Sequence, residues 1–156
     1  MALAKAFAFA VALACGAVGC ARDEAVHPSS GPRFVLAPAV GPVEAIVQEA
    51  LAKATSAHRK LVVYVGATWC DPCARMHRAV EQGELDVIFP DVTLLEFDLD
   101  RDSARLASAG YTSRYIPLFA LPSADGKASG KQIEGAIKGD GAVAFVTPRL
   151  RDLLAR

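Results

Sequence analysis

The sequence predicts a single α/β domain with a central mixed sheet of four to five strands and helices on both faces. Its 156 residues are enough for one hydrophobic core and hardly enough for two. Short β-branched and aromatic segments alternate with segments of helical periodicity, which favours parallel strand pairing. A tight turn at residues 124–126 joins the last two expected strands, which favours an antiparallel hairpin.

Helices are expected where apolar residues recur at helical spacing. The first covers residues 43–54, directly after Pro42, and the others cover 71–82, 103–109 and 140–154. Gly83 and Gly110 are suitable stops for the second and third helices. Thr147 and Pro148 suit an N-cap and a first helical position, so we expect the last helix to be interrupted or restarted there.

Strands are expected at residues 61–65, 92–99, 116–121 and 131–134, where apolar and β-branched residues cluster. The folded domain is therefore placed at 43–156. Residues 21–42 contain many Pro and Gly residues and are expected to form a flexible linker. Within that linker the short run 34–36 could pair as an edge strand.

The first twenty residues resemble a signal peptide. A short n-region with Lys5 precedes an apolar run at 6–14, which is too short and Ala-rich for a transmembrane helix. Residues 17–20, Ala-Val-Gly-Cys, resemble a bacterial lipobox, which implies lipidation of Cys20. Cys15 is a weaker second candidate, and ordinary cleavage near Ala21 or a buried N-terminal helix are the alternatives. We expect an exported, periplasmic protein that is anchored to the membrane as a lipoprotein.

Charge gives no support for a nucleic-acid partner. Basic and acidic residues number 17 each, so the formal net charge is zero. Removing residues 1–20 takes away only Lys5 and leaves 16 basic and 17 acidic residues. Such a balance offers no basic surface for a phosphate backbone, and we expect no nucleic-acid binding.

The chemistry is predicted to lie in the segment 67–73, Ala-Thr-Trp-Cys-Asp-Pro-Cys, between an expected strand and an expected helix. Backbone N–H groups at a helix start are unsatisfied and carry partial positive charge, so a thiolate there is stabilised. Pro72 suits the first turn because its missing N–H is not needed there. Two cysteines at this spacing can close a small disulfide and exchange it with another.

Other interpretations of Cys70 and Cys73 remain open. A structural zinc site needs four ligands, and beyond this pair only His27, His58, His77 and the two N-terminal cysteines are present. Haem attachment would need a His directly after Cys73, where the chain has Ala74. An inert structural disulfide is disfavoured because closing so short a loop gains little entropy. We therefore expect no metal site and no cofactor apart from the dithiol.

The segment around Cys70 resembles the active site of the thioredoxin superfamily, whose usual form is Trp-Cys-Gly-Pro-Cys. Residues 111–117, ending in Ile116-Pro117, resemble the family's segment with a cis-proline beside the dithiol, and residues 133–138 resemble its Gly-bearing last strand. The resemblance spans about residues 43–155 and implies a thioredoxin fold. It implies that Cys70 is the nucleophile, that Cys73 is the resolving thiol, and that Ile116 and Pro117 hold the substrate backbone.

Three positions depart from the family's pattern. Thioredoxins usually bury an acidic residue six positions before the first Cys, and this chain has Tyr64 there, so proton transfer at Cys73 needs another group or water. Asp71 replaces Gly between the cysteines, where its charge disfavours a thiolate and favours the disulfide, unless solvent screens it. A kinking Pro often found in the active-site helix is replaced by Arg78.

Other polar and aromatic residues near the motif are expected to have ordinary roles. Trp69 either shapes the substrate surface or packs as an aromatic. His77 lies one turn beyond Cys73 and could tune it, but a solvated helix face is the preferred interpretation. Five residues are interpreted as the charged end of the second strand and the start of the following helix, and not as a metal cluster: Glu96, Asp98, Asp100, Arg101 and Asp102.

Together these features predict a thiol–disulfide oxidoreductase that acts on exported protein substrates. The expected direction is reduction or isomerisation, with electrons supplied by a membrane donor. The alternatives are a periplasmic disulfide oxidase, and a non-catalytic copper-binding or chaperone-like module that uses Cys70 and Cys73 as soft ligands.

Overall fold

A computed structural model describes residues 31–156 of the chain. The expected signal peptide, Cys15, Cys20 and the first part of the expected linker lie outside these described residues. No helix within residues 31–156 is both long and apolar enough to span a membrane.

Five strands form one mixed sheet in the order β1-β3-β2-β4-β5. They are β1 (Arg33–Leu36), β2 (Lys60–Gly66), β3 (Val92–Asp98), β4 (Leu118–Pro122) and β5 (Ala128–Glu134). β1 and β2 pair with β3 in parallel, whereas β4 pairs with β2 and β5 pairs with β4 in antiparallel fashion. The predicted mixed sheet is thus confirmed, with five strands.

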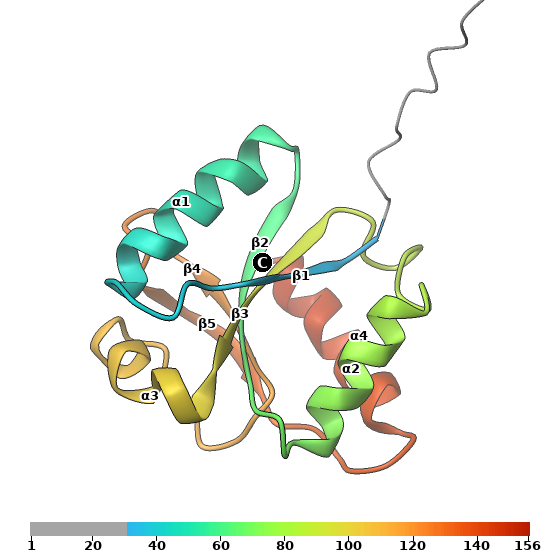
Figure 1. Ribbon diagram of the computed structural model, residues 1–156. Coiled ribbons are helices and arrows are strands. Elements are labelled where there is room, and N and C mark those ends of the chain that lie inside the picture. Colours follow the sequence, from blue (N-terminus) through green and yellow to red (C-terminus); the bar gives the residue numbers. More distant parts are fainter. Residues whose placement is uncertain (1–30) are drawn as a thin grey trace, which may run out of the picture.

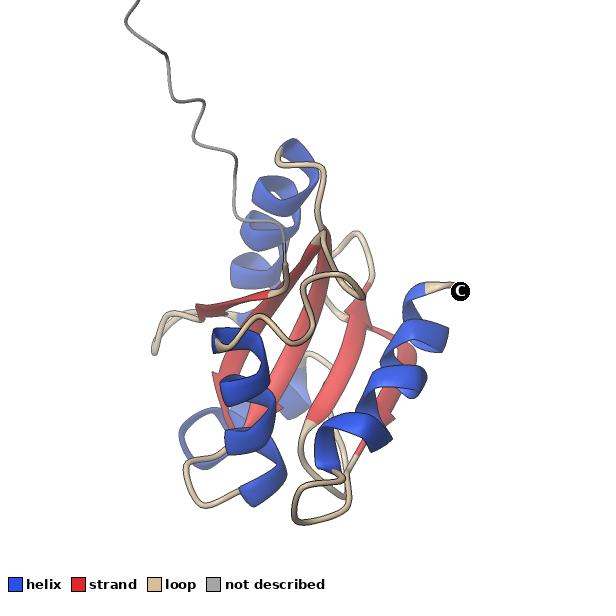
Figure 2. Ribbon diagram, turned by 90° about the vertical axis from the view of Figure 1, so that its right-hand side faces the viewer, coloured by secondary structure: helices blue, strands red, loops and turns tan. Residues whose placement is uncertain are grey.

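The helices cover the sheet in two layers. α1 (Val43–Ser56) and α3 (Leu99–Ser108) lie on one face, and α2 (Asp71–Glu81) and α4 (Ala142–Leu154) lie on the other (Figure 1). Viewed from the second face, α2 and α4 stand side by side in front of the strands (Figure 2). The prediction of an α/β domain with helices on both faces is confirmed.

Strand alternation explains why the core has two parts. Val63, Val65 and Phe97 point toward α1 and α3, while Val62, Tyr64 and Leu94 point toward α2 and α4. Since successive side chains of a strand face opposite sides, a strand covered on both faces is apolar throughout. This is why β2 has the continuous apolar run that marked it in the sequence.

The possible edge strand at 34–36 is confirmed, so this part of the expected linker at 21–42 is ordered. Residues 33–36 form β1, which pairs with β3 from Arg33 opposite Thr93 to Leu36 opposite Glu96. The run has only one half-buried residue, Phe34, so it carries little strand signal by itself. Pairing with an edge that β3 leaves open supplies the missing stabilisation.

The prediction that the last helix is interrupted at Thr147 and Pro148 was wrong. α4 is one helix that contains Pro148 in its interior. Thr147 does not cap a new helix, because its hydroxyl donates to the Val143 carbonyl one turn earlier at 2.8 Å. Val146, Leu150 and Leu153 are buried against the sheet and keep both halves on one axis.

Two further boundaries differ from the expected ones. α3 begins at Leu99, four residues early, because the Asp98 carboxylate accepts a hydrogen bond from the Arg101 N–H at 2.9 Å and caps the helix. β5 begins at Ala128, since the short hairpin after β4 lets pairing start close to the turn.

Candidate active site

Four segments of the chain meet at one end of the sheet, where β2 and β3 finish. Residues 67–70 follow the carboxyl end of β2, and Leu99 follows β3. Because β4 runs antiparallel to β2 and β5 antiparallel to β4, the segment before β4 and the segment after β5 reach the same end. Loops at such an end are positioned by the rigid strands and are a common place for functional groups.

Cys70 and Cys73 form a disulfide at the start of α2. Cys70 is the N-cap residue, and its Sγ accepts a hydrogen bond from the Cys73 N–H at 3.3 Å. Pro72 lies in the first turn, as expected for a residue without an N–H. Both cysteines are almost fully buried. The helix start therefore offers its N–H groups and its dipole to a charge that develops on Cys70.

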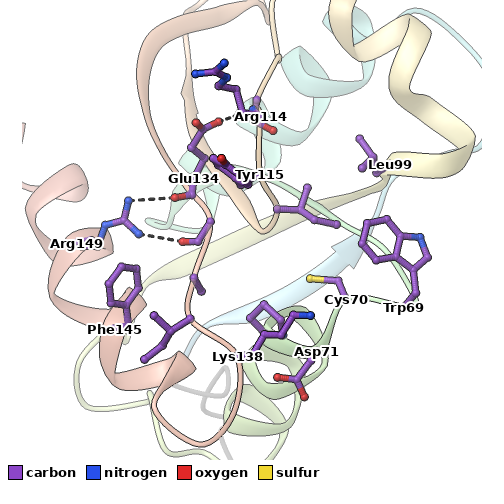
Figure 3. Close-up of a pocket in the computed structure, with 16 residues that line it drawn as sticks. Trp69, Cys70, Asp71, Leu99, Arg114, Tyr115, Glu134, Lys138, Phe145 and Arg149 are labelled. Atoms are coloured by element: carbon purple, nitrogen blue, oxygen red, sulfur yellow. Dashed lines mark hydrogen bonds between the residues drawn. The ribbon is translucent and has the colours of Figure 1, made fainter.

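Cys70 opens into a groove of about 630 Å³. Trp69 lies on one side of Cys70, and Phe145 and Arg149 lie across the groove (Figure 3). Four large apolar side chains of the groove are exposed: Trp69, Tyr115, Ile137 and Phe145. Exposed apolar residues gathered around a reactive group indicate a surface that contacts a partner.

The segment before β4 forms another wall of the groove. The Ile116–Pro117 peptide bond is cis, Ile116 lines the groove, and Pro117 is buried behind it. The Pro117 carbonyl accepts from the Gly135 N–H at 2.9 Å. Gly135 has a φ of +69°, and a Cβ there would lie 3.1 Å from the Tyr115 Cβ. Only glycine therefore lets the two segments approach this closely.

Arg149 holds the end of β5 in place. Its guanidinium donates to the carbonyls of Gly135 at 2.9 Å and Glu134 at 3.1 Å, and it lies 4.8 Å from the centre of the Phe145 ring (Figure 3). This arrangement satisfies carbonyls that have no strand partner and fixes the groove wall opposite Cys70.

Asp71 does not point freely into solvent beside Cys70. Its carboxylate accepts from the Gly139 N–H at 2.9 Å and from Arg75 Nε at 3.1 Å. The Gly139 N–H and then the Arg75 guanidinium hold the pKa of Asp71 below its usual range. Arg75 also pairs with Asp140 at 2.5 Å. The charge expected to act on Cys70 is therefore partly balanced by Arg75.

The predicted site residues are largely brought together. Trp69, Cys70, Asp71, Pro72 and Ile116 line the same groove, and Pro117 lies directly behind it. The Trp69 indole N–H donates to Asp100 at 2.8 Å, so its ring is held at the rim and is not packed in the core. Cys20 lies outside the described residues.

Several groove residues escaped the sequence analysis. They are Leu99, Tyr115, Ile137, Lys138, Phe145 and Arg149. Tyr115 could have been noticed as a neighbour of Ile116, and Phe145 as an aromatic residue on the polar face of an amphipathic helix. Ile137 and Lys138 lie in the segment 133–138, which was noted for its resemblance to a family strand but not as part of the site. Arg149 gave no signal, because a single basic residue on a helix is ordinary.

The interpretation of His77 as a solvated helix residue was wrong. His77 Nε2 lies 2.7 Å from Glu96 Oε1, and the two side chains are only 31% and 17% exposed. The imidazole stacks on Phe34 with 3.8 Å between ring centres. Phe34 belongs to β1, the edge strand that was expected only as a possibility, and its contact with His77 was not predicted. Among residues 31–156 no group of three or more His, Cys, Asp or Glu side chains could hold a metal ion.

Comparison with known proteins gives the following likenesses. No protein-family model and no curated protein matches the sequence. Among solved structures the chain is similar to oxidised thioredoxin O1 from Arabidopsis thaliana, at 23% identity over 80% of this chain and 96% of that one, with a TM-score of 0.46. It is similar to Fasciola hepatica thioredoxin at 24% identity over 72% and 91%, with a TM-score of 0.47. For Trypanosoma brucei brucei thioredoxin the identity is 22% over 86% and 99%, with a TM-score of 0.40.

The fold assignment rests on the chain's own geometry. The mixed sheet, the dithiol at the start of α2 and the Ile116–Pro117 segment beside it agree with the fold that the sequence resemblance implied. The dithiol and this segment meet at one end of the sheet, and the arrangement is suited to thiol–disulfide exchange. The chain has the thioredoxin fold.

Proposed function

We propose that this protein is a thiol–disulfide oxidoreductase that acts on protein substrates through Cys70 and Cys73. One observation carries the proposal: the two cysteines form a disulfide at the start of α2, and Cys70 opens into a groove rimmed by exposed apolar side chains. A structural disulfide would need no such groove. Its 630 Å³ and its apolar rim fit a segment of polypeptide better than a small polar thiol.

The reaction proceeds by two exchanges of sulfur partners. In the reducing direction the Cys70 thiolate attacks one sulfur of a substrate disulfide, forms a mixed disulfide and releases the other substrate sulfur as a thiolate. Cys73 then attacks Cys70 Sγ, which closes the Cys70–Cys73 disulfide and releases the second substrate thiolate. The Cys73 N–H and the start of α2 stabilise the charge on Cys70 before the first attack and whenever Cys70 leaves.

We further propose that the reaction runs in the direction of reduction or isomerisation, on exported proteins, with a membrane donor that reduces the Cys70–Cys73 disulfide. The Asp71 carboxylate beside Cys70 supports this direction, since a negative charge there opposes the thiolate on which strong oxidants depend. The signal-like residues 1–20 and the lipobox-like segment ending in Cys20 support export and a lipid anchor.

The activity is tested with the full chain in which Cys15 and Cys20 are replaced by Ser, so that only two cysteines respond. This protein should reduce an accessible protein disulfide in the presence of a dithiol, and Cys70→Ser should abolish turnover. Cys73→Ser, reduced and then freed of dithiol before it meets the substrate, should instead accumulate a mixed disulfide with the substrate, visible as a covalent adduct on a non-reducing gel. Full turnover by Cys70→Ser would refute the enzyme assignment.

The direction is tested by the reduction potential of the Cys70–Cys73 couple. The expected value lies nearer to about −270 mV, as in thioredoxin, than to about −120 mV, as in the strongest oxidants. Redox equilibration against glutathione measures it. A potential above about −150 mV would refute the reductase assignment and favour the oxidase.

A further inference from the structure

A second cavity borders Cys73 and not Cys70. It has a volume of about 210 Å³ and is lined by residues 66–68, Cys73, Ala74, His77, Glu96 and Asp98. The groove thus serves Cys70, whereas Cys73 adjoins a separate cavity that is also lined by His77, Glu96 and Asp98. A cavity of this size with several polar groups has room for water molecules.

Cys73 must lose a proton to complete the reaction. The thiolate is the nucleophile, and a thiol buried as deeply as Cys73 does not ionise readily. A proton acceptor close to Cys73 would therefore speed the second exchange. Tyr64 cannot serve, because burial, with a smaller contribution from Glu96, raises its pKa and keeps the phenol protonated. The Tyr64 hydroxyl is buried and has no hydrogen-bond partner among the described residues.

His77 and Glu96 have the geometry of an imidazole base and the carboxylate that orients it. His77 lies four residues after Cys73, so both side chains project from the same face of α2. Its Nε2 is engaged by Glu96 at 2.7 Å. When Nε2 carries the hydrogen and donates it to Glu96, Nδ1 is left as the acceptor. The contact with Glu96 thus fixes which ring nitrogen carries the hydrogen and leaves the other nitrogen as the base.

The neighbouring strands hold this pair rigidly. The Phe34 ring of β1 stacks on the imidazole at 3.8 Å, and the Tyr64 ring of β2 meets it edge-on at 5.9 Å. Tyr64 and Glu96 are direct partners in the parallel pairing of β2 with β3. Because β3 is held between β1 and β2 in the sheet, the Glu96 carboxylate is held beside His77.

We propose that His77, oriented by Glu96, accepts the proton of the Cys73 thiol, directly or through water in the cavity, during the second exchange. This proposal rests on the proposed function. The Cys73–Cys70 sulfur bond forms, the bond between Cys70 and the substrate breaks, and the substrate leaves as a thiolate. The Cys73 proton passes to His77, and Glu96 balances the imidazolium charge. In the opposite direction His77 returns the proton to Cys73.

The charged and titratable groups around the imidazole come from three elements. β3 contributes the Glu96 and Asp98 carboxylates, and β2 contributes the neutral Tyr64 phenol. β1 contributes only the Phe34 ring, and α2 itself carries Glu81 one turn after His77. Arg78 directly follows His77, but it is exposed and lines a different cavity beside Arg75 and Asp140. Only an imidazole changes its charge near neutral pH without a special environment, so the pH profile identifies the acceptor.

The test follows the second exchange by itself across pH. The full chain with Cys15→Ser and Cys20→Ser is first reduced. An excess of this protein is then mixed with an aromatic disulfide that releases a coloured thiolate when it is cleaved. The first release of colour reports attack by Cys70, and the second reports attack by Cys73. The variants are His77→Gln, Glu96→Gln, and Arg78→Gln as a matched control on the exposed face of α2.

At pH 7 the second release should slow roughly 10- to 100-fold in His77→Gln, and its dependence on pH should change. Glu96→Gln should slow it less and keep part of the profile, whereas Arg78→Gln should match the wild type. The first release should keep its rate in all three variants, which separates this effect from general damage to the site.

A wild-type profile in His77→Gln would overturn the proposal. Should His77→Gln fail to fold, Glu96→Gln decides, because an unchanged second release in that variant would overturn the proposal equally. A wild type that forms the mixed disulfide and never resolves it would instead refute the proposed function itself. The two failures are therefore distinguishable within one experiment.

Discussion

The Asp71 carboxylate accepts a hydrogen bond from the Gly139 N–H at 2.9 Å and so joins the start of α2 to the loop that precedes α4. Asp71, which directly follows Cys70, thereby also holds the groove wall formed by Ile137 and Lys138. The same carboxylate binds Arg75, which reaches on to Asp140. The charge next to Cys70 is one member of a network and does not act alone.

Asp71→Asn should raise the reduction potential of the Cys70–Cys73 couple. It removes a negative charge beside Cys70 and leaves the Arg75 guanidinium without that partner, and both changes favour a thiolate. The rise should stay below about 30 mV, a factor of ten in the equilibrium constant, because Asp71 is 44% exposed and solvent screens it. Equilibration against glutathione measures it. The double variant Asp71→Asn with Arg75→Gln should return toward the wild-type potential, and an equal rise in both would show that Arg75 has no part.

Asp102 should make the domain sensitive to acid. The carboxylate is fully buried and accepts from Arg101, from Arg105 and from the Asp98 N–H. Burial opposes its ionisation, but these three donors outweigh burial and hold the pKa of Asp102 below its usual range. Its contribution to stability is therefore complete above the unfolded-state pKa of about 3.9 and is lost as pH falls through the lower folded-state value.

Asp102→Asn should lower the free energy of unfolding at pH 7 by about 2–4 kcal/mol, because two arginines lose their partner. The loss should shrink as pH falls below about 4, because the unfolded chain then takes up a proton at this position and the wild type loses the stability that the charged Asp102 contributes. Urea denaturation at a series of pH values measures both effects. Asp152→Asn, on the exposed face of α4, is the control and should change stability by less than about 0.5 kcal/mol. Equal losses in the two variants would contradict the assigned role of Asp102.

Trp69→Ala should weaken the use of protein substrates more than the use of small disulfides. The indole is exposed at the rim of the groove and is oriented by Asp100 at 2.8 Å, so it is placed to contact a polypeptide. We expect KM for a protein disulfide to rise about tenfold, with a smaller change for glutathione disulfide. Trp69→Phe keeps an apolar ring and should recover most of the loss. A uniform loss for both substrates would indicate damage to the dithiol itself.

The N-terminal segment should direct export. A reporter fused after residue 30, ahead of β1, should leave the cytoplasm, and metabolic labelling should attach lipid to the chain. Cys20→Ala should abolish the lipid label, whereas Cys15→Ala should keep it. The reverse pattern would move the modified residue to Cys15. A wild-type chain that is exported without any label would indicate ordinary cleavage near Ala21.

The sequence by itself determined the fold class and the reactive pair. The apolar runs of β2 and β3 and the periodic helices are local patterns, and Cys70 and Cys73 lie within one turn of each other. Local order depends on neighbours along the chain, so spacing and residue type predict it. The Ile116–Pro117 segment was found only through its resemblance to a family motif.

The tertiary structure alone decided which distant residues serve that pair. Glu96 meets His77 because β3 lies beside β2 under α2, and Phe34 covers His77 because a weak strand pairs with the open edge of β3. Asp71 meets Gly139 across 68 positions of the chain. Such contacts depend on how the helices pack on the sheet and on which strands are neighbours. The Glu96 carboxylate within the apolar strand β3 does not by itself predict its contact with His77, because its burial and its partner depend on the whole fold.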